Sequence, residues 1–187
     1  MTPSEYIQLK AFARQDGALL FLLWIASFAC YIIGISSPLY ATVALVLMVT
    51  TPFYVGRRLR RFRDEDLGGR ISFRRGWAYS ILVFFYAGIL LAVAQYVYFA
   101  YMDQGYLLQS LTSAMSSPES KKMIEHYGMG QALNESLDMM RQMRPIDYAL
   151  NVLTMNISLG IVLGMPIAAL MQRRLPPKLG EWGSEQA

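Results

Sequence analysis

Residues 56–76, GRRLRRFRDEDLGGRISFRRG, form the most strongly basic stretch of the chain and lie between two long apolar segments. The stretch contains eight arginines: Arg57, Arg58, Arg60, Arg61, Arg63, Arg70, Arg74 and Arg75. A dense basic loop between two apolar runs is typical of a cytoplasmic connection in a membrane protein with several spans. This stretch therefore sets the orientation that we expect for the whole chain.

The composition supports a membrane protein. Of the 187 residues, 55% are hydrophobic and only 16% are charged, with a mean hydropathy of +0.31. The net charge is +4, but 13 of the 17 lysines and arginines lie in segments that we expect on one side of a membrane. The basic excess therefore indicates topology rather than binding of nucleic acid. The single cysteine, Cys30, cannot form a disulfide within the chain, and the single histidine, His126, excludes a histidine-rich metal site.

The apolar blocks predict an all-α, polytopic membrane protein with four transmembrane helices and a small helical extracytoplasmic cap. Each block approaches the roughly 20 apolar residues that a helix needs to cross a bilayer. The expected order is a cytoplasmic N-terminal segment (1–16), a first span (17–35), a second span (39–55), the arginine-rich cytoplasmic loop (56–76), a third span (77–101), the cap (102–144), a fourth span (145–171) and a cytoplasmic tail (172–187).

Two segments allow a more local prediction. The N-terminal segment begins with a helix-start pattern, Thr2-Pro3-Ser4-Glu5, and is either a helix lying at the cytoplasmic interface or a cap continuous with the first span. In the cap, we expect residues 103–115 to extend the third span outward as helix. Further helices are predicted from Ser117 to about Gly128 and from Gly130 to Met143.

Small residues mark one face of the fourth span. Asn156, Gly160, Gly164 and Ala168 recur every four residues, which lets two helix backbones approach closely. Gln95, in the third span, requires an interhelical hydrogen-bond partner that Asn151 or Asn156 could supply. We predict that the four residues of this ladder and Gln95 pack helices together. The alternative is that Gln95, Asn151 and Asn156 line a transport path in an oligomer.

The arginines of the central loop are candidates for contact with anionic lipid. A basic residue near an anionic leaflet contributes about 1 kcal/mol to membrane association. The candidates are Arg57, Arg58, Arg60, Arg61, Arg63, Arg74 and Arg75. The alternative is a solvated loop that sets orientation and has no specific ligand.

No catalytic constellation is evident. The chain lacks a G-x-S-x-G motif, a phosphate-binding loop and an H-E-x-x-H motif, and we predict neither an enzyme nor a cofactor. Seven methionines lie in and beside the cap: Met102, Met115, Met123, Met129, Met139, Met140 and Met143. Thioethers with His126 would suit Cu(I), whereas methionine also fills small cores. We predict no metal site, and the alternative of copper stays open.

Two short motifs carry a family resemblance. GGRISF (68–73) precedes the third span, and QYVYFAYMD (95–103) stands at its exit. With the order of spans, these motifs resemble the domain-of-unknown-function family 4199, a group of bacterial four-span membrane proteins. The resemblance covers nearly the whole chain. It implies an inner-membrane protein without an assigned activity, and it transfers no catalytic residues.

We therefore expect a bacterial inner-membrane protein with both termini in the cytoplasm that is a structural or accessory component of an envelope process. The expected partners are membrane lipids, together with further copies of the chain or another membrane protein, and not nucleic acid. The rival hypothesis is a small oligomeric transporter or channel for a lipid or a metal ion.

The topology can be tested with a membrane-impermeant maleimide in a Cys30→Ala background. Because 13 basic residues are expected inside and four outside, Ser120→Cys should react in intact spheroplasts and Ser72→Cys should not. Both should react after the membrane is permeabilised, which controls for accessibility. The reverse labelling pattern would invert the predicted orientation.

Overall fold

The structure is a computed structural model that describes residues 3–35 and 37–173. Its elements are α1 (Pro3–Gly34), α2 (Pro38–Arg61), the short π-helix η1 (Phe62–Asp66), α3 (Phe73–Val97), the π-helix η2 (Tyr98–Met102), α4 (Tyr106–Met115), α5 (Pro118–His126), α6 (Gly130–Gln142) and α7 (Pro145–Met171). Within these ranges, four helical segments are long and apolar enough to cross a membrane: α1, α2 with η1, α3 with η2, and α7. The predicted fold class is therefore confirmed.

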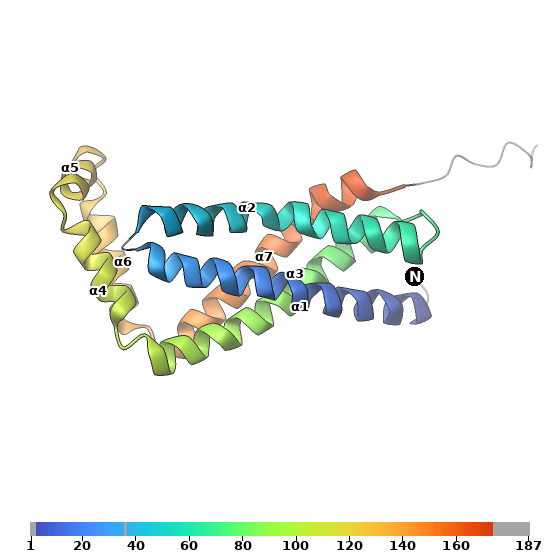
Figure 1. Cartoon of the computed structure of the whole chain (residues 1–187), viewed down its shortest axis with the longest axis horizontal. Helices are drawn as coiled ribbons and strands as arrows, with labels where there is room; N and C mark the ends of the chain where they lie inside the picture. Colours follow the sequence, from blue (N-terminus) through green and yellow to red (C-terminus); the bar gives the residue numbers. More distant parts are fainter. Residues whose placement is uncertain (1–2, 36, 174–187) are drawn as a thin grey trace, which may run out of the picture.

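The four long helices run along the molecule, and α4, α5 and α6 form a cap at one end (Figure 1). Both ends of the described chain lie at the opposite end, beside the connection between α2 and α3. There the backbone N–H of Arg173 donates to the carbonyl of Ile71 at 3.2 Å, and Arg75 pairs with Glu5 at 3.2 Å. We call these the cap end and the arginine-rich end. Most of the predicted tail, residues 174–187, lies outside the described residues.

The helices at the arginine-rich end are longer than the apolar blocks. Helix α1 runs unbroken through Asp16 and Gly17, so the N-terminal segment is continuous with the first span. The predicted loop 56–76 is mostly helical, since α2 and η1 continue to Asp66 and α3 begins at Phe73. The chain turns where Gly68 and Gly69 adopt φ angles of +61° and +81°, a left-handed conformation that favours glycine.

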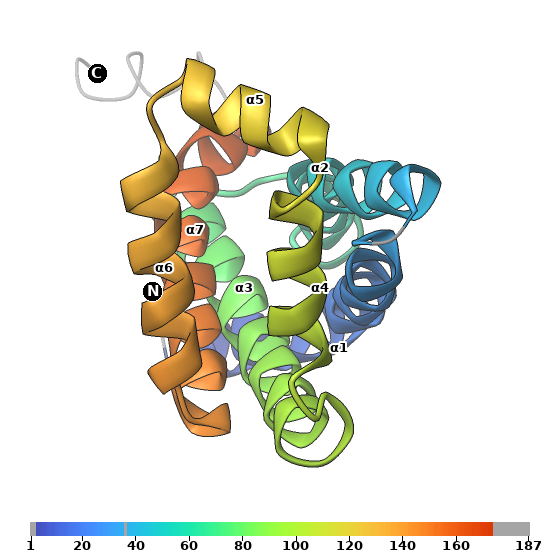
Figure 2. The same ribbon diagram turned by 90° about the vertical axis from the view of Figure 1, so that its left-hand side faces the viewer.

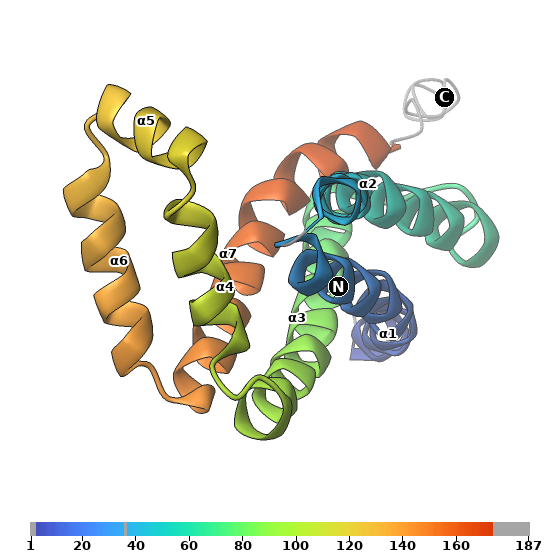
Figure 3. The ribbon, with the colours of Figure 1, turned by 60° about the vertical axis from the view of Figure 1, so that its left-hand side comes forward.

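The cap differs from the sequence prediction at its entry. Residues 103–115 do not extend the third span, because the chain reverses at Gln104 and Gly105, where φ is 45° and 84°. The Asp103 carboxylate stabilises this turn by accepting hydrogen bonds from the backbone N–H groups of Gly105 and Leu107, both at 3.0 Å. Figure 2, from the cap end, shows α4 and α6 across the ends of the long helices. Figure 3 shows α5 joining them at one edge.

Helices α3 and α7 pack against each other in antiparallel directions through small residues. A Cβ atom added to Gly160 would lie 2.7 Å from the Cβ of Phe84, and one added to Gly164 would lie 3.1 Å from Trp77 and 3.2 Å from Ser80. Helix α3 contributes glycines of its own. A Cβ at Gly88 would lie 3.2 Å from the Cβ of Asn156, and one at Gly76 would lie 3.5 Å from that of Ala168. Each helix thus has small residues at the positions where the other helix approaches it closely.

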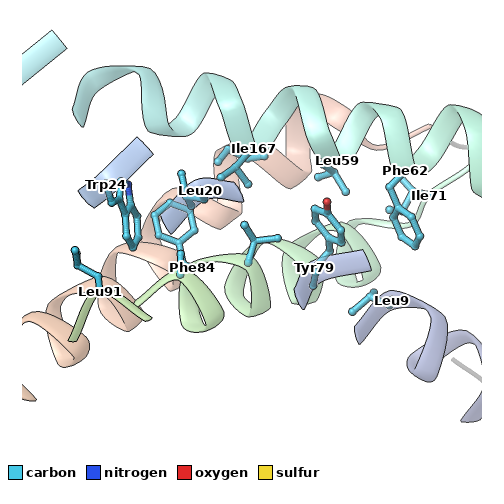
Figure 4. Close-up of a cluster of buried hydrophobic side chains, with 14 residues drawn as sticks. Leu9, Leu20, Trp24, Leu59, Phe62, Ile71, Tyr79, Phe84, Leu91 and Ile167 are labelled. Carbon is cyan, nitrogen blue, oxygen red and sulfur yellow. The ribbon is translucent and has the colours of Figure 1, made fainter. Parts of the chain in front are cut away.

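A buried apolar cluster joins all four long helices (Figure 4). Phe62 stacks on Tyr79 with ring centroids 5.2 Å apart, and Trp24 meets Phe84 edge to face at 5.7 Å. Leu20, Val83 and Ile167 belong to the same cluster, and all are buried. Between helices in lipid, such contacts stabilise through dispersion and shape fit rather than through removal of apolar surface from water.

Gly164→Ile should destabilise the seam between α3 and α7, because the new side chain would overlap Trp77 and Ser80. Overpacking of this kind costs typically 1–3 kcal/mol. We expect a lower midpoint of thermal unfolding in detergent. Ala169→Ile, which adds the same branched side chain on the exposed face of α7, is the matched control and should leave the midpoint nearly unchanged. Equal midpoints of thermal unfolding for the two variants would contradict a stabilising role for the close packing of α3 and α7.

Candidate functional site

A cavity with a volume of about 660 Å³ lies between the long helices toward the cap end. This volume lies within the range of roughly 300–1,000 Å³ found for small-molecule sites. Its walls come from α1 (Trp24, Ser27, Phe28, Tyr31), α2 (Ala41, Ala44, Leu45, Met48), α3 with η2 (Leu91, Gln95, Phe99) and α7 (Tyr148, Val152, Met155, Asn156). Leu107 of α4 and Met140 of α6 complete the lining from the cap.

The cavity arises because α2 and α7 diverge. The two helices meet at the arginine-rich end, where a Cβ on Gly56 would lie 3.6 Å from Met171, and they separate toward the cap (Figure 1). Along the divergence, Leu45 and Met48 of α2 and Met155 of α7 are 50–64% exposed. The inner wall of the cavity, which we call its floor, is buried. The cavity therefore opens sideways, between α2 and α7, onto the apolar surface that would face lipid.

Two amide side chains form the polar part of the floor. Gln95 is 6% exposed and Asn156 is 5% exposed. Within the described residues, the Oε1 atom of Gln95 and the Nδ2 atom of Asn156 have no hydrogen-bond partner. The interhelical hydrogen bond expected for Gln95 is therefore not formed through that oxygen, and Asn151 lies exposed outside the cavity. Leaving a buried polar group unpaired costs about 1–3 kcal/mol.

Three other polar groups of the lining are paired within the chain. The indole N–H of Trp24 donates to the Thr51 hydroxyl at 3.0 Å, and the Ser27 hydroxyl donates to the carbonyl of Ala44 at 3.0 Å. The Tyr148 hydroxyl donates to the carbonyl of Met140 at 2.9 Å, which also ties the cap to α7. The two amides therefore stand out as hydrogen-bonding capacity that the fold leaves available to a ligand.

A buried ionic cluster at the junction of α1, α2 and α3 was missed from the sequence. The Asp16 carboxylate is 3% exposed and accepts hydrogen bonds from the Arg58 guanidinium and the Tyr79 hydroxyl. The next residue, Gly17, lets α1 approach α3, since a Cβ there would lie 2.8 Å from Tyr86. The available signal was an acidic residue and a glycine at the edge of an apolar block. The partners are 42 and 63 residues away, too far for a local pattern to reveal.

The arginines proposed for lipid contact divide into two groups. Three are held within the chain: Arg58 by Asp16, Arg63 by Asp64 and by the carbonyl of Met171 at the end of α7 (2.8 Å), and Arg75 by Glu5 and Gln8. The contact of Arg63 places a cation at the negative end of the α7 dipole. The second group is exposed: Arg57, Arg60, Arg61 and Arg74. Of these, Arg60 and Arg61 pair along the helix with Asp64 and Glu65.

The cap methionines are dispersed. Met140 lines the cavity, whereas Met102, Met123, Met129 and Met139 are 46–68% exposed. Across residues 3–35 and 37–173, no group of three or more His, Cys, Asp or Glu side chains is arranged to hold a metal ion.

The family model described as "Protein of unknown function (DUF4199)" matches residues 15–173. The chain belongs to this family. The DUF4199 match includes Asp16 and every residue that lines the cavity, and the resemblance carried by residues 68–73 and 95–103 is confirmed. The first of these two motifs contains the turn before α3. The second contains Gln95 and also Asp103, whose carboxylate stabilises the turn before α4. Neither the curated proteins nor the solved structures gave a match.

Arg58→Met in this DUF4199 protein should be strongly destabilising, because it leaves the Asp16 carboxylate buried and without its cation. Breaking a buried ion pair costs about 3–5 kcal/mol. The double variant Asp16→Asn with Arg58→Met should recover much of the loss, since it removes the unpaired charge and keeps an acceptor for Tyr79. Thermal unfolding in detergent measures both, with exposed Arg57→Met as the control. If the double variant were no more stable than Arg58→Met alone, the energetic coupling between Asp16 and Arg58 would be contradicted.

Proposed function

We propose that the protein is an accessory component of an envelope process in the bacterial inner membrane, and that it acts by holding the apolar part of a membrane lipid. The observation that carries this proposal is the apolar cavity of about 660 Å³, which opens sideways between α2 and α7 and has two unpaired amides in its floor. A ligand that enters from the bilayer would meet apolar walls first and hydrogen-bonding groups last.

The proposed orientation places the arginine-rich end in the cytoplasm and the cap outside. Arg57, Arg60, Arg61 and Arg74 are exposed at this end, where they would contact the anionic lipid of the cytoplasmic leaflet. The cavity would then lie in the outer half of the bilayer. Its ligand would enter from the outer leaflet.

A channel or transporter for a lipid or metal ion is the competing function. In a single chain, the space on the arginine-rich side of the cavity is filled by the buried side chains of Leu59, Phe62 and Tyr79. This filling favours a binding site with one entrance over a path that crosses the membrane. The proposal accordingly assigns the protein a binding role and no reaction. Its partners would be lipids and a membrane protein or further copies of this chain.

The proposal is tested by reducing the cavity volume. Ala44→Phe fills a buried position of the lining, and Ala29→Phe adds the same ring on the exposed face of α1 outside the cavity. Native mass spectrometry of protein extracted directly from membranes would count bound lipid-sized molecules. We expect about one per chain in the wild type and in Ala29→Phe, and a severalfold lower occupancy in Ala44→Phe. Equal occupancy in all three, or none in the wild type, would overturn the proposal.

A further inference from the structure

The chemistry of the cavity lining restricts the ligand, given the proposed function on which this inference rests. We propose that the cavity binds a neutral, single-chain amphiphile whose head group, such as a hydroxyl or a primary or secondary amide, hydrogen-bonds with Gln95 and Asn156. Three features of the lining carry the proposal: its lack of charge, its two unpaired amides and its volume.

The lining excludes a charged head group. Among the residues that the structure describes, the side chains that line the cavity include no Asp, Glu, Lys, Arg or His. A charge moved into such an apolar site without a counter-charge carries a large desolvation cost. Asp103, near the cap end, already accepts two backbone hydrogen bonds at the start of α4. A fatty-acid carboxylate or a phospholipid phosphate would therefore bind far more weakly than an uncharged head.

The amides select a head group that both donates and accepts hydrogen bonds. The unpaired atoms of Gln95 and Asn156 are an acceptor and a donor as the amides are oriented, and rotation of either amide exchanges the two roles. A hydroxyl or a primary or secondary amide can satisfy one of each. Because Trp24 and Ser27 bond within the chain, their polar groups do not compete for the head. The ligand head is thus expected at the floor, with its chain directed along the aromatic wall.

The volume indicates one chain. At roughly 30 Å³ for each water-sized group, about 660 Å³ accommodates on the order of 20 such groups. A monoacylglycerol or a fatty amide of medium length is of this size. An intact phospholipid with two chains is larger, and its second chain would have to remain in the bilayer.

Trp24 supplies a spectroscopic probe because it lines the cavity. The full-length protein in nanodiscs would be titrated with three lipids that share one bromine-labelled medium-length chain and differ in the head: a monoacylglycerol, a fatty acid at neutral pH and a lysophosphatidylglycerol. Bromine quenches indole fluorescence at close range. We expect saturable quenching by the monoacylglycerol, at least tenfold weaker quenching by the two anionic lipids, and loss of the saturable part in Trp24→Phe.

Substitutions at the floor test the role of the amides. Gln95→Leu and Asn156→Leu preserve volume and remove the polar atoms, and each should weaken monoacylglycerol binding about tenfold, as expected for one lost hydrogen bond. Asn151→Leu, exposed on the same helix, is the matched control and should bind like the wild type. The thermal midpoint of the floor variants should not fall, because they remove unpaired buried groups. Unchanged affinity in both floor variants would overturn the assignment of the head group.

The possible failures separate this inference from the proposed function. Equal affinity for all three heads would overturn the neutral ligand and leave a lipid site in place. Absence of saturable quenching by any of them, with no bound lipid in native mass spectrometry, would overturn both. Efficient inter-chain crosslinking of Leu45→Cys or Met155→Cys, in a Cys30→Ala background, would show a second copy covering the opening, and would also overturn the ligand site.

Discussion

The close approach of α3 and α7 is the constraint on which the rest of the structure depends. In a bilayer, apolar side chains gain little by leaving lipid for protein, so helices associate through close contact between complementary surfaces. A Cβ atom on Gly160 would clash with Phe84 at 2.7 Å, and one on Gly164 would lie only 3.1 Å from Trp77 and 3.2 Å from Ser80. This seam fixes the register of the two helices, and that register brings Gln95 and Asn156 to the same cavity floor.

Polar contacts at the arginine-rich end tie the other two long helices to this pair. Gly17 lets α1 approach α3, and Asp16 receives hydrogen bonds from Arg58 of α2 and Tyr79 of α3. A buried ionic cluster of this kind specifies how the three helices pack, because removing one partner leaves the others buried and unpaired, which costs free energy. Arg63 adds a contact between the end of α2 and the end of α7. Toward the cap, no comparable tie holds α2 to α7 in the described residues, and the cavity forms where they part.

The two halves of the molecule therefore have different physical characters. The arginine-rich half is closely packed, with Tyr79, Phe62 and Leu59 at most 1% exposed and the buried Asp16 carboxylate paired, although the Tyr54 hydroxyl and the Nε atom of Arg75 lack partners there among the described residues. The cap half retains a space with two unpaired amides, a state that lowers stability by about 1–3 kcal/mol for each group. Proteins tolerate such a cost at sites that bind something, because the ligand supplies the missing partners. In the cap half the unpaired atoms belong to residues that line the cavity, and this is why we place function there.

The sequence by itself determined the fold class, the four long helices and the family. Apolar blocks near 20 residues in length and motifs at 68–73 and 95–103 are local features, and local features can be recognised without knowing which helices touch. The four-residue spacing from Asn156 to Ala168 was equally visible as a packing face. Only the tertiary structure decided that this face meets α3, that Asp16 pairs with Arg58 and Tyr79, and that residues from six segments line one cavity. The physical reason is that helices in lipid lack a strong apolar driving force to reveal their partners, so neighbour choice depends on shape and hydrogen bonding between residues far apart in the chain.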